Sequence, residues 1–364
     1  MPLSYFCTAM PDLILSPAEF LAARAARVTL DVRSPGEYAQ GHIPGAISFP
    51  LFNDEERAQV GTLYKQQGKE EAMLLGLKIV GPKMEKFVRE ARKLAPQRRL
   101  AVHCWRGGQR SGSMAWLFRQ AGFDVVTLQG GYKNYRRHVL ESFEQVSFPM
   151  IVIGGQTGTG KTKILHELQR MGEQIIDLEA LAHHKGSAFG AIGELPQPTV
   201  EQFENDLFEA MRHLDLNRRV WLENESRSIG RVFIPDGFWR HFKASALFNI
   251  EVPFECRIKN LVDDYTGISA VELEDAFRRI EKKLGGQHLK TALEALQTGD
   301  YAAAAAIALR YYDKTYHYGL ENNTSPDIRM MRFGHGDIKR IARECLTQAE
   351  IPANVAVSLP AAEG

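Results

Sequence analysis

The feature that most constrains the fold is an apolar run at 150–153 that leads directly into a glycine-rich loop and a helical segment. The loop reads Gly155-Gln156-Thr157-Gly158-Thr159-Gly160-Lys161-Thr162, which matches the phosphate-binding pattern G-x-x-x-x-G-K-[ST] in its required context. The pattern predicts an α/β core in which backbone amides around Gly155, Gly158 and Gly160 cradle a phosphate. Lys161 should neutralise that phosphate, and the Thr162 hydroxyl is placed for Mg²⁺.

This P-loop indicates a di- or triphosphate but not the rest of the ligand. Nucleotide hydrolases usually add an apolar strand that ends in an acidic residue. The nearest candidates are Glu223 and Glu225 after one apolar strand, and Asp177 after a shorter one. We find no guanine-reading motif, so the loop alone does not establish an ordinary ATPase or GTPase.

A second loop, around Cys104, carries a candidate nucleophile. The segment follows a predicted strand at 99–103 and opens a predicted helix at 111–121, so its backbone amides can surround one anion. Gly107 and Gly108 let the backbone approach closely, while Arg106 and Arg110 add positive charge. Together with the helix dipole, these charges favour a thiolate at Cys104.

Three interpretations of this loop compete. Cys104 could be a small buried apolar residue, but an inert cysteine needs no neighbouring arginines and glycines. The spacing Cys-x5-Arg between Cys104 and Arg110 also occurs in cysteine-dependent phosphatases. The loop alone therefore admits both a thiolate that carries a transferred group and a thiolate that hydrolyses a phosphoester.

The chain has 364 residues, which predicts at least two domains. Alternating strands and helices before and after the boundary near 149 indicate α/β domains with parallel sheets. From 255 onward helical periodicity dominates. We therefore expect a domain at 12–140, a P-loop α/β domain at 149–254, a helical C-terminal region at 255–350 and a disordered tail at 351–364.

The composition indicates the cellular compartment of the protein but not its binding partners. A formal net charge of +1 gives no overall attraction to nucleic acid. The four cysteines are widely spaced, there is no basic signal segment, and no apolar run reaches about 18 residues, so we expect a cytoplasmic protein without a membrane span. Adjacent His183 and His184 point in different directions on a regular backbone, and no metal-ligand site is predicted there.

One basic cluster in the helical region could contact RNA. It consists of Arg278, Arg279, Lys282 and Lys283, with several tyrosines further along the chain. Basic helices interleaved with aromatic residues suit an RNA backbone and unstacked bases. A solvated helical face and a tyrosine-rich core explain the same pattern equally well.

The ordered landmarks of the first domain resemble a rhodanese domain. They are Asp31-Val32-Arg33, Glu37, Gly41-His42-Ile43-Pro44-Gly45-Ala46, the Cys104 loop and Leu128-Gln129-Gly130-Gly131-Tyr132. The spacing to Arg110 is one residue longer than in common single-domain rhodaneses. With the P-loop and the stretches at 57–68, 177–179, 186–190 and 223–230, nearly the whole chain resembles the tRNA 2-selenouridine synthases.

This resemblance implies an enzyme that replaces the sulfur of wobble 2-thiouridine with selenium from selenophosphate, through an S-geranyl intermediate made from geranyl diphosphate. It implies that Cys104 carries selenium as an S-selanylcysteine and that Arg106, Gly107, Gly108 and Arg110 hold selenophosphate. The P-loop would hold the geranyl diphosphate. The implied partners are the Lys, Glu and Gln tRNAs and a selenophosphate supply enzyme. A phosphatase and a P-loop-regulated sulfur or selenium carrier without tRNA turnover are the alternatives.

Overall fold

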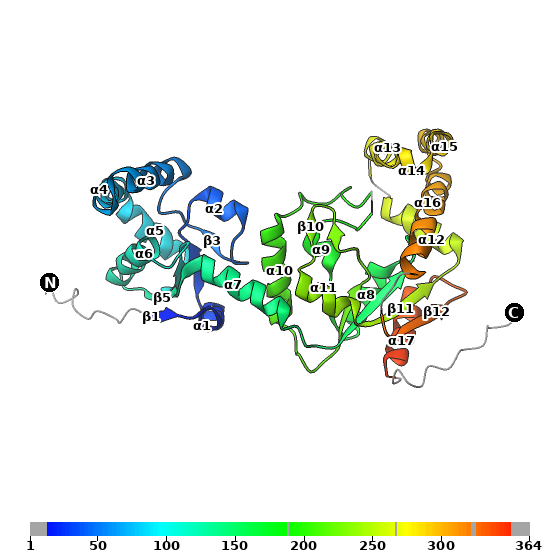
Figure 1. Ribbon diagram of the computed structural model, residues 1–364, viewed down its shortest axis with the longest axis horizontal. Helices are drawn as coiled ribbons and strands as arrows, with labels where there is room; N and C mark the ends of the chain where they lie inside the picture. Colours follow the sequence, from blue (N-terminus) through cyan, green and yellow to red (C-terminus); the bar gives the residue numbers. More distant parts are fainter. Residues whose placement is uncertain (1–12, 188, 266–267, 322–324, 351–364) are drawn as a thin grey trace. The chain divides into compact units, whose positions relative to one another are not determined.

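The computed structural model describes residues 13–187, 189–265, 268–321 and 325–350 (Figure 1). The expected tail at 351–364 lies outside these residues. The chain forms two compact units, one comprising Met1–Ser142 together with Glu204–Asp206, the other comprising Phe143–Phe203 and Leu207–Gly364. The functional loop around Cys104 belongs to the first unit and the P-loop to the second.

The first unit is built on a five-stranded parallel sheet with the order β1-β5-β4-β2-β3. The strands are β1 (Leu13–Leu15), β2 (Val28–Asp31), β3 (Ile47–Ser48), β4 (Arg99–His103) and β5 (Asp124–Leu128). The central β4 is buried from Leu100 onward, as expected for a strand covered on both faces. This architecture confirms the predicted rhodanese-like parallel sheet and places Cys104 at the carboxyl end of its middle strand.

Helices cover this sheet. They are α1 (Pro17–Ala23), α2 (Pro35–Gln40), α3 (Asp54–Gln67), α4 (Lys69–Val80), α5 (Met84–Leu94), α6 (Gln109–Gln120) and α7 (Gly131–Glu144). The core joins β2 and β4 to α5 and α6 through buried side chains such as Leu30, Val102, Phe87 and Phe118. These contacts fix the position of α6, whose first turn ends the Cys104 loop.

The second unit also contains a five-stranded parallel sheet, in the order β12-β11-β6-β8-β7. Its strands are β6 (Met150–Gly155), β7 (Gln174–Ile176), β8 (Val220–Glu223), β11 (Ala246–Glu251) and β12 (Ile328–Arg332), with a small separate hairpin of β9 (Ser228–Ile229) and β10 (Val232–Phe233). The predicted strands before 254 are all present. The P-loop follows the central strand β6.

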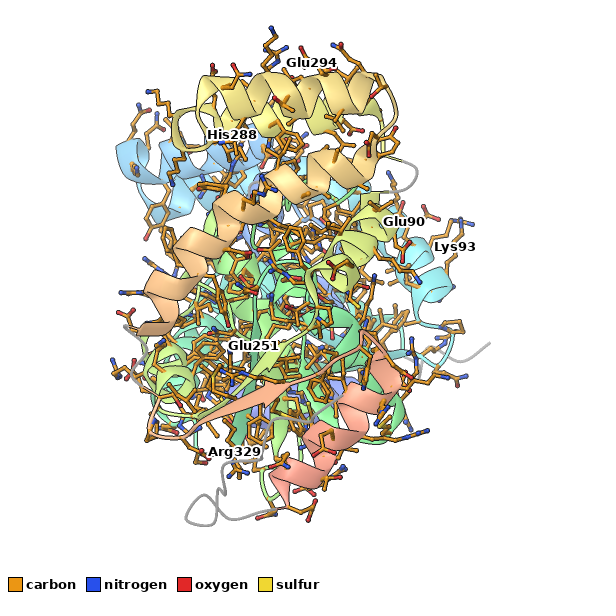
Figure 2. All side chains as sticks on the ribbon, turned by 90° about the vertical axis from the view of Figure 1, so that its right-hand side faces the viewer. Glu90, Lys93, Glu251, His288, Glu294 and Arg329 are labelled. Atoms are coloured by element: carbon orange, nitrogen blue, oxygen red, sulfur yellow. The ribbon has the colours of Figure 1, made fainter. Side chains whose placement is uncertain are left out.

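Strand β12 was not predicted, because the region from 255 was expected to be helical throughout. It pairs in parallel with β11, and Figure 2 shows it at the near edge of the sheet, with Arg329 and Glu251 labelled. Its sequence, IRMMR, contains a single β-branched residue. Pairing with β11, rather than local propensity, makes it a strand.

The remaining helices of this unit form two groups. Helix α8 (Lys161–Arg170) packs against α17 (Ile338–Ala349), and α9 (Leu178–Ala182), α10 (Val200–Arg212) and α11 (Asp236–Lys243) connect the strands. A C-terminal helical layer comprises α12 (Phe254–Tyr265), α13 (Ala270–Arg279), α14 (Glu281–Leu284), α15 (Gly286–Gln297) and α16 (Tyr301–Glu321). In the described part of the chain, no helix has both the length and the apolar character needed to cross a membrane.

Candidate functional site

The cysteine site lies where β4 ends and α6 begins. Cys104 is only 3% exposed, and its Sγ lies 3.2 Å from the Oγ of Ser111. Gly108 is the residue before the first turn of α6, so the loop closes on a helix N-terminus. The predicted strand–loop–helix arrangement around Cys104 is therefore present, and it presents backbone dipoles suited to an anion.

Two backbone segments meet tightly at this site. The amide of Tyr132 donates to the carbonyl of Cys104 over 2.8 Å, and that of Lys133 donates to Trp105 over 2.9 Å. Gly107 has φ +64°, and a Cβ there would lie 2.6 Å from the Leu128 carbonyl oxygen. A Cβ on Gly108 would meet nothing within 4 Å. Of the two glycines, Gly107 is thus sterically required.

Arg110 is held by a carboxylate. Its Nη1 donates to Oε2 of Glu37 over 2.6 Å, and its Nη2 donates to Oε1 over 3.3 Å. Burial opposes the charge of Glu37, but the hydrogen bond and the charge of Arg110 lower its pKa below the usual range. Arg106 is exposed, whereas the guanidinium of Arg110 is oriented before any substrate arrives.

A buried ion pair supports the loop from behind. Arg33 and Asp31 are both fully buried, and Nη2 of Arg33 donates to Oδ2 of Asp31 over 2.6 Å. The same guanidinium lies 3.7 Å from the ring centroid of Tyr132, on the segment that contacts Cys104. Burial lowers the pKa of the neighbouring His103 to about 4, so this ring stays neutral at pH 7. The rhodanese landmark at 31–33 therefore has a structural role here.

The P-loop joins β6 to α8 as predicted. Gly160, with φ +86°, precedes the first helical residue, Lys161, whose Nζ donates to the Gly155 carbonyl over 3.2 Å. The Thr162 hydroxyl lies 3.2 Å from Oε2 of Glu179 and 3.1 Å from Oε2 of Glu223. The predicted phosphate-binding residues are thus gathered at one end of the sheet.

Helix α12 braces this loop through residues that sequence reasoning missed. Arg257 is 3% exposed, and its Nε donates to the Thr157 carbonyl over 2.9 Å while its guanidinium pairs with Asp313. Asn260 donates to the Gly158 carbonyl over 2.9 Å, and a Cβ on Gly158 would lie 2.8 Å from the Arg257 carbonyl oxygen. A single arginine in an amphipathic helix gives no sequence signal for this role.

Three glutamates converge beside the P-loop. The two predicted acidic residues, Glu223 and Glu225, lie close to Glu179, and one carboxylate oxygen from each of the three lies within 4.8 Å of the others. Burial and the charge of Glu179 raise the pKa of Glu223 well above its usual range and that of Glu225 to about 8. Asp177, the other candidate, instead caps α9 and hydrogen-bonds His166.

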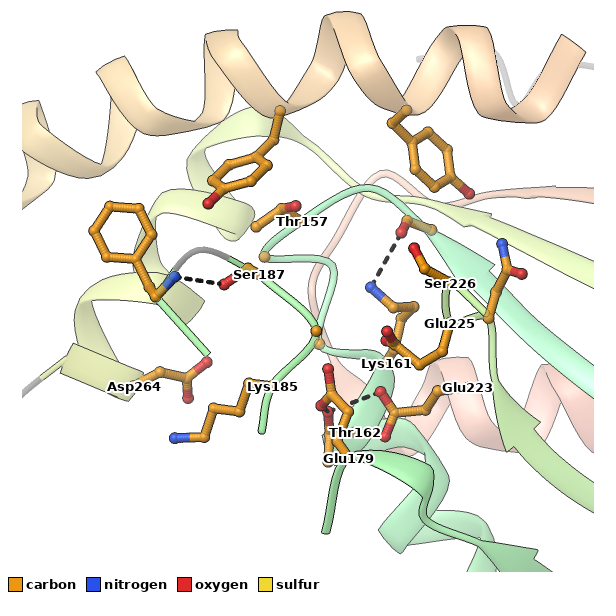
Figure 3. Close-up of a pocket in the computed structure, with 18 of the residues that line it drawn as sticks. Thr157, Lys161, Thr162, Glu179, Lys185, Ser187, Glu223, Glu225, Ser226 and Asp264 are labelled. Carbon is orange, nitrogen blue, oxygen red and sulfur yellow. Dashed lines mark hydrogen bonds between the residues drawn. The ribbon is translucent and has the colours of Figure 1, made fainter. Parts of the chain in front are cut away.

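A cavity of about 770 Å³ opens next to these groups (Figure 3). Its polar part contains the P-loop, the three glutamates and Lys185. Its lining also includes apolar and aromatic side chains: Phe189, Ile192, Trp239, Leu261, Ile268, Tyr312 and Tyr316. The cavity therefore suits a ligand with one phosphorylated end and one apolar end.

The predicted RNA-contact residues lie elsewhere in the helical layer. Arg278 and Arg279 end α13, and Lys282 and Lys283 lie in α14; all four are exposed. Tyr312, by contrast, packs against Phe189 and lines the cavity. The basic side chains are accessible to a polyanion, and their contact with tRNA remains a prediction.

Fold and site together define a rhodanese-like domain joined to a P-loop α/β domain. Residues 16–138 match the rhodanese-like domain family, and residues 148–348 match the family described as the tRNA 2-selenouridine synthase AAA domain. The chain belongs to the tRNA 2-selenouridine synthase family, as the sequence resemblance predicted.

Individual relatives agree with this assignment. A tRNA 2-selenouridine synthase of Nitrosomonas europaea is 38% identical over 243 residues, which cover 65% of this chain and 63% of that protein. Its counterpart from Sulfurovum sp. is 36% identical over 335 residues, covering 81% of this chain and 89% of that protein. A solved N-terminal domain of a Clostridium difficile 630 protein, described as ATP/GTP binding, is 40% identical over 35% of this chain and 98% of its own, with a TM-score of 0.34.

Proposed function

We propose that this protein is a tRNA-modifying selenotransferase that converts wobble 2-thiouridine into 2-selenouridine. The named activity of its relatives supports the overall conversion. In the proposed sequence, geranyl diphosphate first alkylates the thiocarbonyl sulfur. Selenium from selenophosphate then replaces the geranylated sulfur at C2, and the sulfur leaves as geranyl thiol. Alkylation matters because a bare thiocarbonyl sulfur is a poor leaving group.

The observation that carries the geranyl step is the two-sided cavity of the second unit. Besides the phosphate-binding groups, the lining of this cavity contains the apolar side chains of Phe189, Ile192 and Leu261. The ten-carbon geranyl chain would pack against these side chains. Lys161 and the loop amides would stabilise the departing diphosphate. The proposal includes a Mg²⁺ ion bound by the Thr162 hydroxyl.

The selenium step is assigned to the first unit. Cys104 would carry the selenium, and the loop amides with Arg106 and Arg110 would bind the oxygens of selenophosphate. The Cys104 thiolate would attack selenium, and the P–Se bond would break with its electron pair on phosphorus, so that phosphite leaves. After the terminal selenium has displaced geranyl thiol at C2, two equivalents of an external thiol would cleave the S–Se bond and restore Cys104, leaving as a disulfide. The pair between Arg110 and Glu37 does not separate this step from the phosphatase alternative, because selenophosphate and a phosphoester dianion would each compete with the carboxylate on that guanidinium. A phosphatase would nevertheless hydrolyse a generic aryl phosphate, at a rate lost on changing Arg110.

The two halves can be tested separately in cells that lack the protein, by mass spectrometry of their tRNA nucleosides. Complementation with Cys104→Ala should accumulate S-geranyl-2-thiouridine, and complementation with Lys161→Ala should leave 2-thiouridine. Cys256→Ala is the matched control, since this cysteine lies outside both loops and should restore 2-selenouridine. Normal 2-selenouridine in the Cys104→Ala cells, or loss of selenation alone in the Lys161→Ala cells, would contradict the assignment.

The tRNA would reach the protein in the cytoplasm, with Lys, Glu and Gln tRNAs as the proposed substrates. The exposed cluster of Arg278, Arg279, Lys282 and Lys283 would contribute phosphate contacts. An enzyme that makes selenophosphate is the proposed supplier of the donor. A carrier without tRNA turnover would load selenium on Cys104 but leave the nucleoside unchanged in the same assay.

A further inference from the structure

The carboxylates of Glu179, Glu223 and Glu225 have the spacing of ligands around one cation. Their nearest oxygens lie within 4.8 Å of one another. Mg²⁺ binds oxygen at about 2.0 to 2.1 Å and Ca²⁺ at about 2.3 to 2.6 Å, so two oxygens on the same ion are at most about 4.2 Å apart for Mg²⁺ and about 5.2 Å for Ca²⁺. A separation of 4.8 Å would therefore have to close by about 0.6 Å around Mg²⁺. Figure 3 shows Glu179 and Glu223 beside Thr162, with its hydroxyl bonded to both carboxylates.

A separate observation concerns one carboxylate oxygen of this cluster. Glu223 is 0% exposed, and its Oε1 is buried without a hydrogen-bond partner among the described residues. The other oxygen of the same carboxylate accepts from Thr162 over 3.1 Å. A buried carboxylate oxygen without a donor from the protein is costly, and a cation would satisfy it.

The chemistry of the donor atoms selects the kind of ion. The ammonium group of Lys161 is directed to the Gly155 carbonyl, 3.2 Å away. The donor set is entirely oxygen, which selects Mg²⁺ or Mn²⁺ over metals that prefer nitrogen or sulfur.

We propose that Glu179, Glu223, Glu225 and the Thr162 hydroxyl bind one Mg²⁺ or Mn²⁺ ion before any diphosphate arrives. In common P-loop enzymes the ion is held by one hydroxyl, one acidic residue and the phosphates, so it enters with the nucleotide. With three carboxylate ligands from the protein, the ion would bind without the phosphates. The role of the ion, to neutralise the departing diphosphate, rests on the proposed geranyl transfer; its binding does not.

Mn²⁺ binding to the full-length protein tests the site directly. Electron paramagnetic resonance of free Mn²⁺, titrated into phosphate-free protein, should report one bound ion per chain that Mg²⁺ displaces. Glu223→Gln should weaken binding at least tenfold, and Glu179→Gln should act in the same direction. Asp264→Asn is the matched control, since Asp264 lines the same cavity but pairs with Lys163 over 2.9 Å, and it should bind as wild type.

Thermal unfolding shows whether a variant binds less Mn²⁺ because it folds poorly. In chelator, Glu223→Gln should unfold at the same or a higher temperature than wild type, because the substitution removes a buried ionisable group from beside Glu179. Added Mn²⁺ should raise the unfolding temperature of wild type but not of this variant. Absence of Mn²⁺ binding without diphosphate, wild-type binding by Glu223→Gln, or equal loss in Asp264→Asn would overturn the proposal. Bound Mn²⁺ with no geranylated tRNA would refute the proposed function alone.

Discussion

Replacing Gly107 by Ala should distort the Cys104 loop far more than the same change at Gly108. A Cβ at 107 would lie 2.6 Å from the Leu128 carbonyl oxygen and 2.9 Å from the amide nitrogens of Gly130 and Gly131. These are backbone atoms, so no side chain can rotate away. The left-handed φ of +64° adds a further penalty. Strain and overpacking together should cost about 2 to 5 kcal/mol of stability.

The matched control is Gly108→Ala, where the added Cβ meets nothing within 4 Å and the cost should stay below about 1 kcal/mol. Urea unfolding followed by hydrogen exchange of peptides from the first unit measures both variants. In Gly107→Ala, amides at 104–108 and 128–133 should also lose protection under native conditions. Equal destabilisation by the two substitutions, or unchanged protection in Gly107→Ala, would refute the steric argument.

Three further predictions concern residues that support the two loops. Glu37→Gln leaves the largely buried Arg110 without its anion and should lower the free energy of unfolding of the first unit, measured in urea, by about 1 to 3 kcal/mol. The control Glu85→Gln, at an exposed ion pair, should lower it by less than about 0.5 kcal/mol. Equal losses in the two variants would contradict this reasoning. His103 has an ordinary pKa of 6.5 and a folded pKa of about 4, so the unfolded chain is protonated first and stability should fall between pH 6.5 and 4, by on the order of 3 kcal/mol. His103→Phe should flatten this acid limb, and an unchanged pH profile would show that other groups cause it. Arg257→Met should weaken geranyl diphosphate binding at least tenfold by calorimetry, because Arg257 fixes the Thr157 carbonyl; the exposed Arg278→Met should not.

The local sequence pattern was sufficient to predict where the two loops lie in the fold. The P-loop and the Cys104 loop were both predicted between a strand and a helix, and both occur there. The reason is that each uses short-range requirements, such as a buried strand, a glycine where φ is positive and a helix N-terminus. The same local reasoning treated Gly107 and Gly108 alike, although only the surroundings of Gly107 forbid a side chain.

Strand β12 shows where local pattern fails. Its residues include the charged Arg329 and Arg332, and they lie in a region of helical periodicity. They become a strand because β11 offers an unsatisfied edge, with Leu247 opposite Ile328. Helix α17 then adds Ile341 and Cys345 to the P-loop core, so part of the expected helical region completes that domain.

By itself, the sequence predicted the two loops that the proposed chemistry uses, a cysteine loop at the end of one parallel sheet and a phosphate-binding pattern at the end of another. The tertiary structure decided what surrounds them. Arg110 faces Glu37, Arg257 braces the P-loop from a helix about a hundred residues away, and Glu179 joins Glu223 and Glu225. These contacts depend on long-range packing of partly or fully buried charges, whose partners no spacing in the sequence specifies.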